Sequence, residues 1–146
     1  MIQPIVLPLP GMAVLQAEAR SEGYDFIETT VAEWASGVNR FDRPGEKFYG
    51  YFDNGQLVGV GGLTLDPFAG RADVGRIRRI YVRAAWRNRG IGRALVSALV
   101  EHARKGFASV RLRAENADAA RLYESIGFLP IIDANASHRM EFDEDF

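Results

Sequence analysis

The sequence contains no cysteine among its 146 residues. Zinc ribbons, thiol nucleophiles, disulfide frameworks and iron–sulfur clusters all depend on sulfur, so these classes of chemistry are excluded. Long apolar runs are also missing, because the longest, residues 2–12 and 57–65, are too short for a membrane span and are interrupted by Pro, Gly or polar residues. No lysine- or arginine-led region precedes the first run, so we expect a cytoplasmic protein with no secretion signal and no membrane partner.

The composition provides enough apolar material for one hydrophobic core, since 47% of the residues are hydrophobic. A domain of this size buries roughly 68–70% of the surface that its unfolded chain exposes. It therefore needs neither disulfides nor a structural metal, and we expect no metal site. No repeat or flexible linker divides the chain, so residues 1–146 are expected to form a single domain.

Charge is unevenly distributed along the chain although the net charge is only −1. Residues 71–121 contain 13 basic and 4 acidic side chains, a local charge of +9, whereas residues 1–70 and 122–146 each carry −5. Arginine outnumbers lysine 16 to 2, and the planar guanidinium is well suited to phosphate. A basic segment within an acidic protein predicts one localised anion site.

Periodicity and turn residues predict an alternation of strands and helices. Strands are expected over residues 2–7, 47–52, 56–65, 74–82, 109–114, 128–133 and 138–142. Helices are expected over residues 12–21, from Asp25 to Gly37, from Gly90 to Gly106 and from Asn116 to Gly127. The Asn54-Gly55 pair predicts a tight hairpin. The resulting order, βααβββαβαββ, indicates a mixed α/β (α+β) fold rather than a doubly wound sheet.

The central segment joins the strand at residues 74–82 to a helix through a loop with Gly90 and Gly92. A helix N-terminus presents unpaired N–H groups, and glycines let an anion approach the backbone, so a pyrophosphate fits there. Arg87, Arg89 and Arg93 can add charge-assisted hydrogen bonds. A simple turn with a solvated arginine face is the alternative. The loop lacks the Gly-Lys-Ser/Thr of a P-loop and the third glycine of a dinucleotide fingerprint.

Two motifs in this region resemble one family. Arg87-x-x-Gly90-x-Gly92, directly after Ile80-Tyr81-Val82, is similar to the acyl-CoA motif of the GCN5-related N-acetyltransferases. Residues 111–128 resemble that family's strand–Asn–helix–Tyr–Gly-Phe block at the usual separation. The resemblance covers about residues 74–129 and implies a twisted, mixed sheet of six to seven strands flanked by about four helices. One departure is Ala84, where many relatives have proline, which puts the rigidity of the loop in doubt.

The resemblance also implies a role for each matching residue. The backbone of Ile80, Tyr81 and Val82 would pair with the pantetheine arm of acetyl-CoA, the co-substrate, and one N–H would polarise the thioester carbonyl. The pyrophosphate would be held by the N–H groups of Arg87, Asn88, Arg89, Gly90, Ile91, Gly92 and Arg93, with the Arg87 and Arg89 side chains in support. Asn116 would bind the pantetheine, and Tyr123 would protonate the departing thiolate as the general acid. From the residues alone, Tyr123 can also be a packing aromatic and Asn116 only a helix cap.

The acceptor implied by the resemblance is a primary amine of a small molecule or peptide. Its candidate walls are Tyr24, Glu28, Glu33, Trp34 and Asp73, with His138 also near the expected acceptor position. An acidic pocket would favour a cationic amine, and the alternative is that the glutamates are ordinary helix surface. Strand alternation predicts that Arg78 and Arg79 lie on opposite faces of their strand, so that at least one reaches a cleft. If that arginine faces the acceptor, the acceptor carries a carboxylate or phosphate.

Two other functional classes fit parts of the sequence. A non-catalytic acyl-CoA-binding or sensing module of the same fold would not need the Tyr123 hydroxyl. Nucleic-acid binding through the basic segment is not expected, because only Tyr81 and Trp86 are interleaved with its arginines and the pI is about 6.1. The family resemblance further suggests a homodimer.

Overall fold

The computed structural model describes residues 1–142 of the chain. They form one seven-stranded sheet in the order β1-β2-β3-β4-β5-β7-β6, in which only β4 and β5 are parallel neighbours. The expected mixed sheet and four helices are confirmed. The strands are β1 (Ile2–Pro4), β2 (Lys47–Asp53), β3 (Gln56–Leu65), β4 (Val74–Val82), β5 (Ser109–Leu112), β6 (Leu129–Pro130) and β7 (His138–Glu141). The helices are α1 (Met12–Ser21), α2 (Phe26–Ser36), α3 (Ile91–Ala103) and α4 (Ala117–Ile126), with a single 3-10 turn at Ala84–Trp86.

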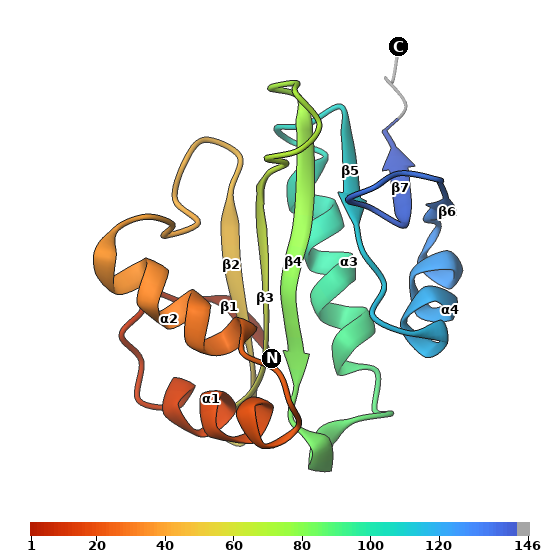
Figure 1. The fold of residues 1–146 in the computed structure, drawn as a ribbon. Coiled ribbons are helices and arrows are strands. Elements are labelled where there is room, and N and C mark those ends of the chain that lie inside the picture. Colours follow the sequence, from red (N-terminus) through yellow and green to blue (C-terminus); the bar gives the residue numbers. More distant parts are fainter. Residues whose placement is uncertain (143–146) are drawn as a thin grey trace.

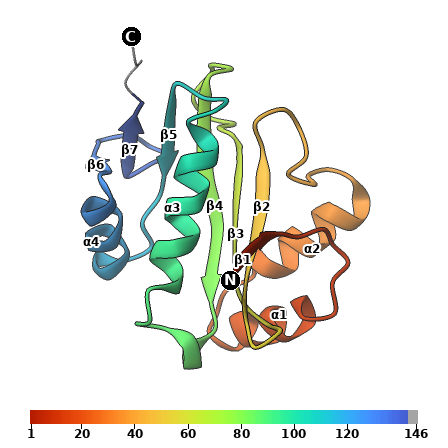
Figure 2. The ribbon, with the colours of Figure 1, turned by 180° about the vertical axis from the view of Figure 1, so that it is seen from behind.

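The helices cover both faces of the sheet (Figures 1 and 2). Helices α1 and α2 pack on one face, where Leu15, Ile27 and Phe48 belong to one buried cluster. Helix α3 covers the other face, and α4 lies beside it at the β5–β7 end. There, Leu99 and Phe128 belong to a second cluster. Burial of these apolar side chains provides the main driving force for the fold.

Four expected strands are shorter in the structure, although β5 ends only two residues early, at Leu112, and β7 only one, at Glu141. The first ends at Pro4 rather than at residue 7, although the Ile5 N–H still donates to the Phe48 carbonyl at 3.1 Å. The strand expected at 128–133 is reduced to Leu129–Pro130. Proline has no N–H to donate to a strand ladder, and the Asp133 carboxylate accepts from the Asn135 N–H in a turn. By contrast, the hairpin between β2 and β3 is confirmed, with Asn54 and Gly55 both at positive φ.

A β-bulge interrupts the pairing of β3 with β4. Gly62 pairs with Arg78, but Val60 already pairs with Tyr81, so β4 has one extra residue. Arg79 has a φ of +62°, a left-handed conformation that non-glycine residues rarely adopt. The strand therefore changes its alternation at Arg79.

The bulge corrects the expectation that Arg78 and Arg79 lie on opposite faces. Arg79 Nη1 donates to Thr30 Oγ1 at 2.9 Å and to Glu33 Oε1 at 3.0 Å, both on α2. Arg78 is on the same face, because it pairs with Gly62, whose added Cβ would meet Phe41 of the α1/α2-side cluster. Simple period-2 alternation fails here because the extra residue rotates the following side chains.

Strands β4 and β5 separate soon after they meet. Their pairing runs only from Val74↔Ser109 to Arg76↔Arg111. Beyond Arg76, the edge of β4 that faces β5 has no strand partner within residues 1–142, and Figure 1 shows the two strands diverging there. This splay leaves an edge of β4 open for an added, strand-like ligand.

Candidate functional site

The N-terminus of α3 forms a cradle of free backbone donors. Gly90 caps the helix at a φ of +83°, and Asn88 is also at positive φ. The first helical hydrogen bond runs from the Ala94 N–H to the Gly90 carbonyl at 3.0 Å, and the N–H groups of residues 88–93 find no acceptor within the described chain. No atom lies within 4 Å of a Cβ added at Gly90. Free donors beside open space at a helix N-terminus suit a phosphate group.

The Arg87 side chain is directed away from this cradle. Its Nε donates to the Val82 carbonyl at 2.9 Å, and its Nη2 donates to Glu22 Oε1 at 2.6 Å. Its guanidinium also lies 5.5 Å from the centre of the Tyr81 ring. The hydrogen bond to Glu22 raises the pKa of Arg87 and, with the Tyr81 hydroxyl, lowers that of Glu22. Arg87 thus ties the loop to α1.

The other two loop arginines remain available to an anion. Arg89 is exposed and makes no ion pair to a described residue, and Arg93 donates only to Ser125 Oγ, at 2.7 Å. The expected phosphate support from Arg89 stays a prediction. Arg93 is therefore the second arginine, besides Arg89, whose side chain has no carboxylate partner at this helix end, and Arg87 is not.

The loop before the cradle is fixed without a proline. Glu18 on α1 accepts from the Ala84 N–H at 2.6 Å and from Arg83 Nε at 2.8 Å. Trp86 Nε1 donates to Asp53 Oδ2 at 2.8 Å. A proline at position 84 would lack the N–H that donates to Glu18. This chain therefore holds the loop by hydrogen bonds rather than by a proline ring.

A cleft of about 210 Å³ lies beside the splayed part of β4. Side chains from β4, α4, the start of α2 and the segment after β5 line it. They include Phe26, Arg78, Ile80, Arg113, Glu115 and Tyr123. Arg76 and Arg79 line it as well, so the cleft combines an apolar wall with four arginines, one carboxylate and one phenol. The sequence does not identify Glu115 as a site residue, because no local signal distinguishes this acidic residue beside Asn116 from the others.

Tyr123 has the environment of a proton donor. Its side chain is buried, at 8% relative exposure, with the ring against Phe128 and His138 at centroid distances of 6.1 and 6.5 Å. Burial, and secondarily the charge of Glu115, raise the pKa of Tyr123. No residue in the described chain makes a hydrogen bond to its hydroxyl. The phenol stays protonated at neutral pH, with its hydrogen free for a ligand.

Asn116 caps α4, as its sequence position also allowed. Its Oδ1 accepts from the Ala119 N–H at 2.9 Å, and the pantetheine contact implied by the resemblance stays a prediction.

His138 is buried behind Tyr123, with Nε2 2.8 Å from Glu124 Oε2 and Nδ1 2.8 Å from Ser137 Oγ. Both of its ring nitrogens are engaged, so His138 supports the wall behind Tyr123.

The expected acceptor walls are largely wrong. None of Tyr24, Glu28, Glu33, Trp34 and Asp73 lines the cleft that holds Tyr123. Trp34 is buried in the core, with its ring 5.5 Å from that of Phe48. Asp73 pairs with Arg71 in the β3–β4 loop. Sequence position and charge group Trp34 and Asp73 with the candidate acceptor walls, but the tertiary fold determines how Trp34 packs and which residue Asp73 pairs with.

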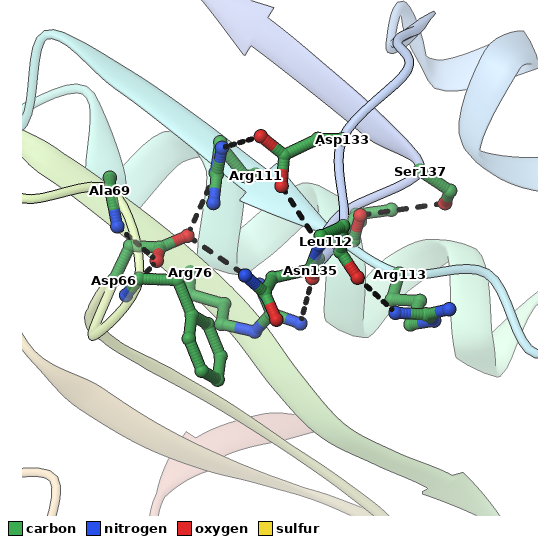
Figure 3. A network of polar contacts seen from close by, with 11 residues as sticks. Asp66, Ala69, Arg76, Arg111, Leu112, Arg113, Asp133, Asn135 and Ser137 are labelled. Atoms are coloured by element: carbon green, nitrogen blue, oxygen red, sulfur yellow. Dashed lines mark hydrogen bonds and ion pairs between the residues drawn. The ribbon is translucent and has the colours of Figure 1, made fainter.

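A polar network links the end of β3, strands β4 and β5 and the β6–β7 loop (Figure 3). Asp66, at the end of β3, accepts from Arg111 Nε at 3.0 Å and lies 3.5 Å from Arg76 Nη1. Arg111 also bonds to Asp133, and Arg76 Nη2 donates to the Asn135 carbonyl at 2.7 Å. The network fastens the β6–β7 loop to β4 and β5.

Most arginines of the basic segment are paired with carboxylates, five of them with residues outside the segment and three with residues inside it. Of the 12 arginines in residues 71–121, eight form ion pairs with carboxylates. The four without a carboxylate partner in the described structure are Arg78, Arg89, Arg93 and Arg113. Two lie at the α3 cradle and two line the cleft, so uncompensated positive charge remains at both places.

Two further features concern metals and membranes. Within residues 1–142, no three His, Asp or Glu side chains gather as metal ligands. No helix in that range is long and apolar enough to cross a membrane.

Comparison with known proteins gives consistent matches. A model of the acetyltransferase (GNAT) family matches residues 12–128. The N-alpha-acetyltransferase RimI of Mycobacterium tuberculosis is 34% identical over 130 residues, which are 86% of this chain and 79% of that protein. A solved structure from Exiguobacterium sp. 255-15 matches with a TM-score of 0.84 and 25% identity over 97% of this chain and 92% of that one. The PaiA N-acetyltransferase of Thermoplasma acidophilum, solved in complex with coenzyme A, has the same fold, with a TM-score of 0.64 and 19% identity over 97% and 99% of the two chains.

Proposed function

Since the chain belongs to the acetyltransferase (GNAT) family, we propose that it is an enzyme that transfers the acetyl group of acetyl-CoA to a primary amine by direct attack. The acceptor is a small molecule or a peptide. One observation carries the proposal: the open edge of β4 runs between a cradle of free N–H groups at residues 88–93 and the unpartnered hydroxyl of Tyr123. The name of the mycobacterial relative supports N-acetylation.

The residues at the α3 end fit the diphosphate of the donor. Free N–H groups and the helix dipole favour an anion there, and Arg89 and Arg93 add charge without a competing carboxylate. The open β4 edge, which includes Ile80, Tyr81 and Val82, suits the amide groups of the pantetheine arm. The thioester would then lie near Tyr123.

The chemistry assigned to the cleft has three parts. The neutral amine attacks the thioester carbon, the new N–C bond forms, and a β4 N–H stabilises the oxyanion. The C–S bond then breaks, and the Tyr123 hydroxyl donates its proton to the thiolate sulfur. We assign the proton lost by the amine to Glu115, directly or through water, because no other carboxylate of residues 1–142 lines the cleft.

A non-catalytic acyl-CoA-binding module is the second candidate. It would bind acetyl-CoA through the same cradle but would gain nothing from a buried phenol with a free hydroxyl. The homodimer and the cytoplasmic location expected from the sequence remain predictions.

Two measurements made together test the proposal. Acetyl-CoA is titrated into the protein by calorimetry, and thiol release is followed across pools of amines, amino acids, polyamines, aminoglycosides and peptides. Binding with thiol release in one pool supports the enzyme. Binding without release in any pool supports the sensing module, and absence of binding contradicts both.

A further inference from the structure

Arg78 is a partly buried cation without a partner in the cleft beside Tyr123. It makes no hydrogen bond or ion pair with any residue in the described chain. Its two neighbours on the same strand are both engaged: Arg76 with Asp66 and Asn135, and Arg79 with Glu33 and Thr30. The bulge at Arg79 brings that side chain to the face of Arg78 without providing Arg78 with a partner.

Holding this charge in place costs free energy in the unliganded protein. Burial, and then repulsion from Arg79 and Arg76, lower the pKa of Arg78. A guanidinium that loses water without gaining a hydrogen bond destabilises the fold. An anion that enters the cleft would supply the missing partner, in the fork geometry that guanidinium favours.

The remaining lining of the cleft indicates what carries that anion. Tyr123 and Glu115, the groups assigned to proton transfer, line the same cleft as Arg78, so the amine and the anion belong to one compact molecule. The cleft volume of about 210 Å³ is below the usual range for drug-sized ligands. Arg113, the other lining arginine without a carboxylate partner, donates to the Ala134 carbonyl at 3.1 Å, so among the described residues Arg78 alone in the cleft has no hydrogen bond at its guanidinium. One such guanidinium balances one carboxylate, whereas a phosphate dianion would call for more charge.

We propose that Arg78 binds the carboxylate of a free amino acid whose amine is the acetyl acceptor. This inference rests on the proposed function. The reaction converts acetyl-CoA and the amino acid to the N-acetyl amino acid and CoA-SH. The amine proton passes to Glu115, and the Tyr123 proton passes to the sulfur. Arg78 takes no part in these transfers and sets specificity.

Matched acceptor pairs test the proposal. Thiol release is measured for each common amino acid and for its carboxamide, which keeps the amine but removes the negative charge. We compare the wild-type protein with Arg78→Gln, which removes the cation, and Arg78→Lys, which keeps the charge but loses the fork. Arg121→Gln on the exposed side of α4, where Arg121 pairs with Asp118, is the charge-matched control.

The expected result is a wild-type preference for the free acid and a loss of about 30-fold in kcat/KM for that acid in Arg78→Gln, the range typical of a charged hydrogen bond. The carboxamide should change less than about threefold, Arg78→Lys should be intermediate, and Arg121→Gln should behave as wild type. Equal losses for acid and amide, or a wild-type preference for the amide, would overturn the inference.

The outcomes separate this inference from the proposed function. Thiol release with peptides or polyamines but with no free amino acid refutes the role of Arg78 and leaves the acetyltransferase intact. Absence of release with every amine refutes both. Melting temperatures of the variants serve as the folding control, and Arg78→Gln should be at least as stable as wild type.

Discussion

Arg111 Nε donates to Asp66 Oδ2 at 3.0 Å, and the Asp66 side chain is fully buried. The same carboxylate accepts from the N–H groups of Phe68 and Ala69. It therefore compensates charge from two neighbouring parallel strands and holds the turn after β3. This bond joins the segments that frame the cleft, although their residues are 45 positions apart in the sequence.

Replacement of this carboxylate should destabilise the fold. We expect Asp66→Asn to lower the free energy of unfolding by about 3 kcal/mol, because it leaves Arg76 and Arg111 without their buried counter-charge. Urea denaturation measures the difference. Asp73→Asn is the matched control, since its pair with Arg71 is exposed, and should cost less than about 0.5 kcal/mol. Similar losses of unfolding free energy in both variants would show that the buried Asp66 network stabilises the fold no more than the exposed Asp73–Arg71 pair does.

Loss of the Tyr123 hydroxyl should affect the chemical step. We expect Tyr123→Phe to lower kcat more than tenfold while the affinity for CoA stays within about threefold, because the ring still packs but the proton donor is gone. Steady-state thiol release and calorimetry give the two quantities. Equal loss of turnover and affinity would indicate a packing role instead.

The pKa of the Tyr123 hydroxyl determines the pH above which kcat falls because the proton donor is lost. Since the pKa of Tyr123 is raised above its ordinary value of 10.0, we expect no fall in kcat between about pH 8 and 10 from loss of the acid. A descending limb centred below about pH 9 that disappears in Tyr123→Phe would contradict the raised pKa.

A glycine comparison tests the phosphate cradle. Gly90 and Gly23 both have positive φ, and neither has an atom within 4 Å of an added Cβ. Each Gly→Ala change should therefore cost about 1 kcal/mol of backbone strain. Only Gly90→Ala should weaken acetyl-CoA binding, by about tenfold, because its methyl group occupies the space offered to the diphosphate. Equal affinities in calorimetry would place the donor elsewhere.

The contact between α1 and the loop should respond to acid. Hydrogen bonds from Arg87 and Tyr81 lower the pKa of Glu22 from its ordinary 4.5. A carboxylate whose pKa is lower in the folded than in the unfolded state stabilises the fold at pH values above its unfolded pKa. This stabilisation is lost as the pH falls through the folded pKa, so it disappears below about pH 4.5. Melting temperatures from about pH 7 to 3 should fall less steeply in Glu22→Gln than in wild type. Parallel curves would contradict the assignment.

The sequence was informative wherever a local signal sets the structure. Asn54-Gly55 fixes a hairpin because both residues tolerate positive φ, and Asn116 caps a helix through its own side chain. The loop from Arg87 to Gly92 carried the family resemblance.

The rest depends on contacts that span the chain. No local signal marks Arg79 for a left-handed bulge, because its conformation comes from the pairing of β4 with β3. The expectations for Trp34 and Asp73 failed for a similar reason, since charge and composition do not reveal which side chains the fold brings to one cleft.

Direct observation of acetyl transfer tests the central claim best. The protein is incubated with acetyl-CoA that carries a deuterated acetyl group and with the amine pool that releases most thiol, and the products are analysed by mass spectrometry. The account predicts an amine heavier by one labelled acetyl group, formed in equal amount to free CoA and lost in Tyr123→Phe. Thiol release with the label recovered as free acetate, or no release at all, would contradict it.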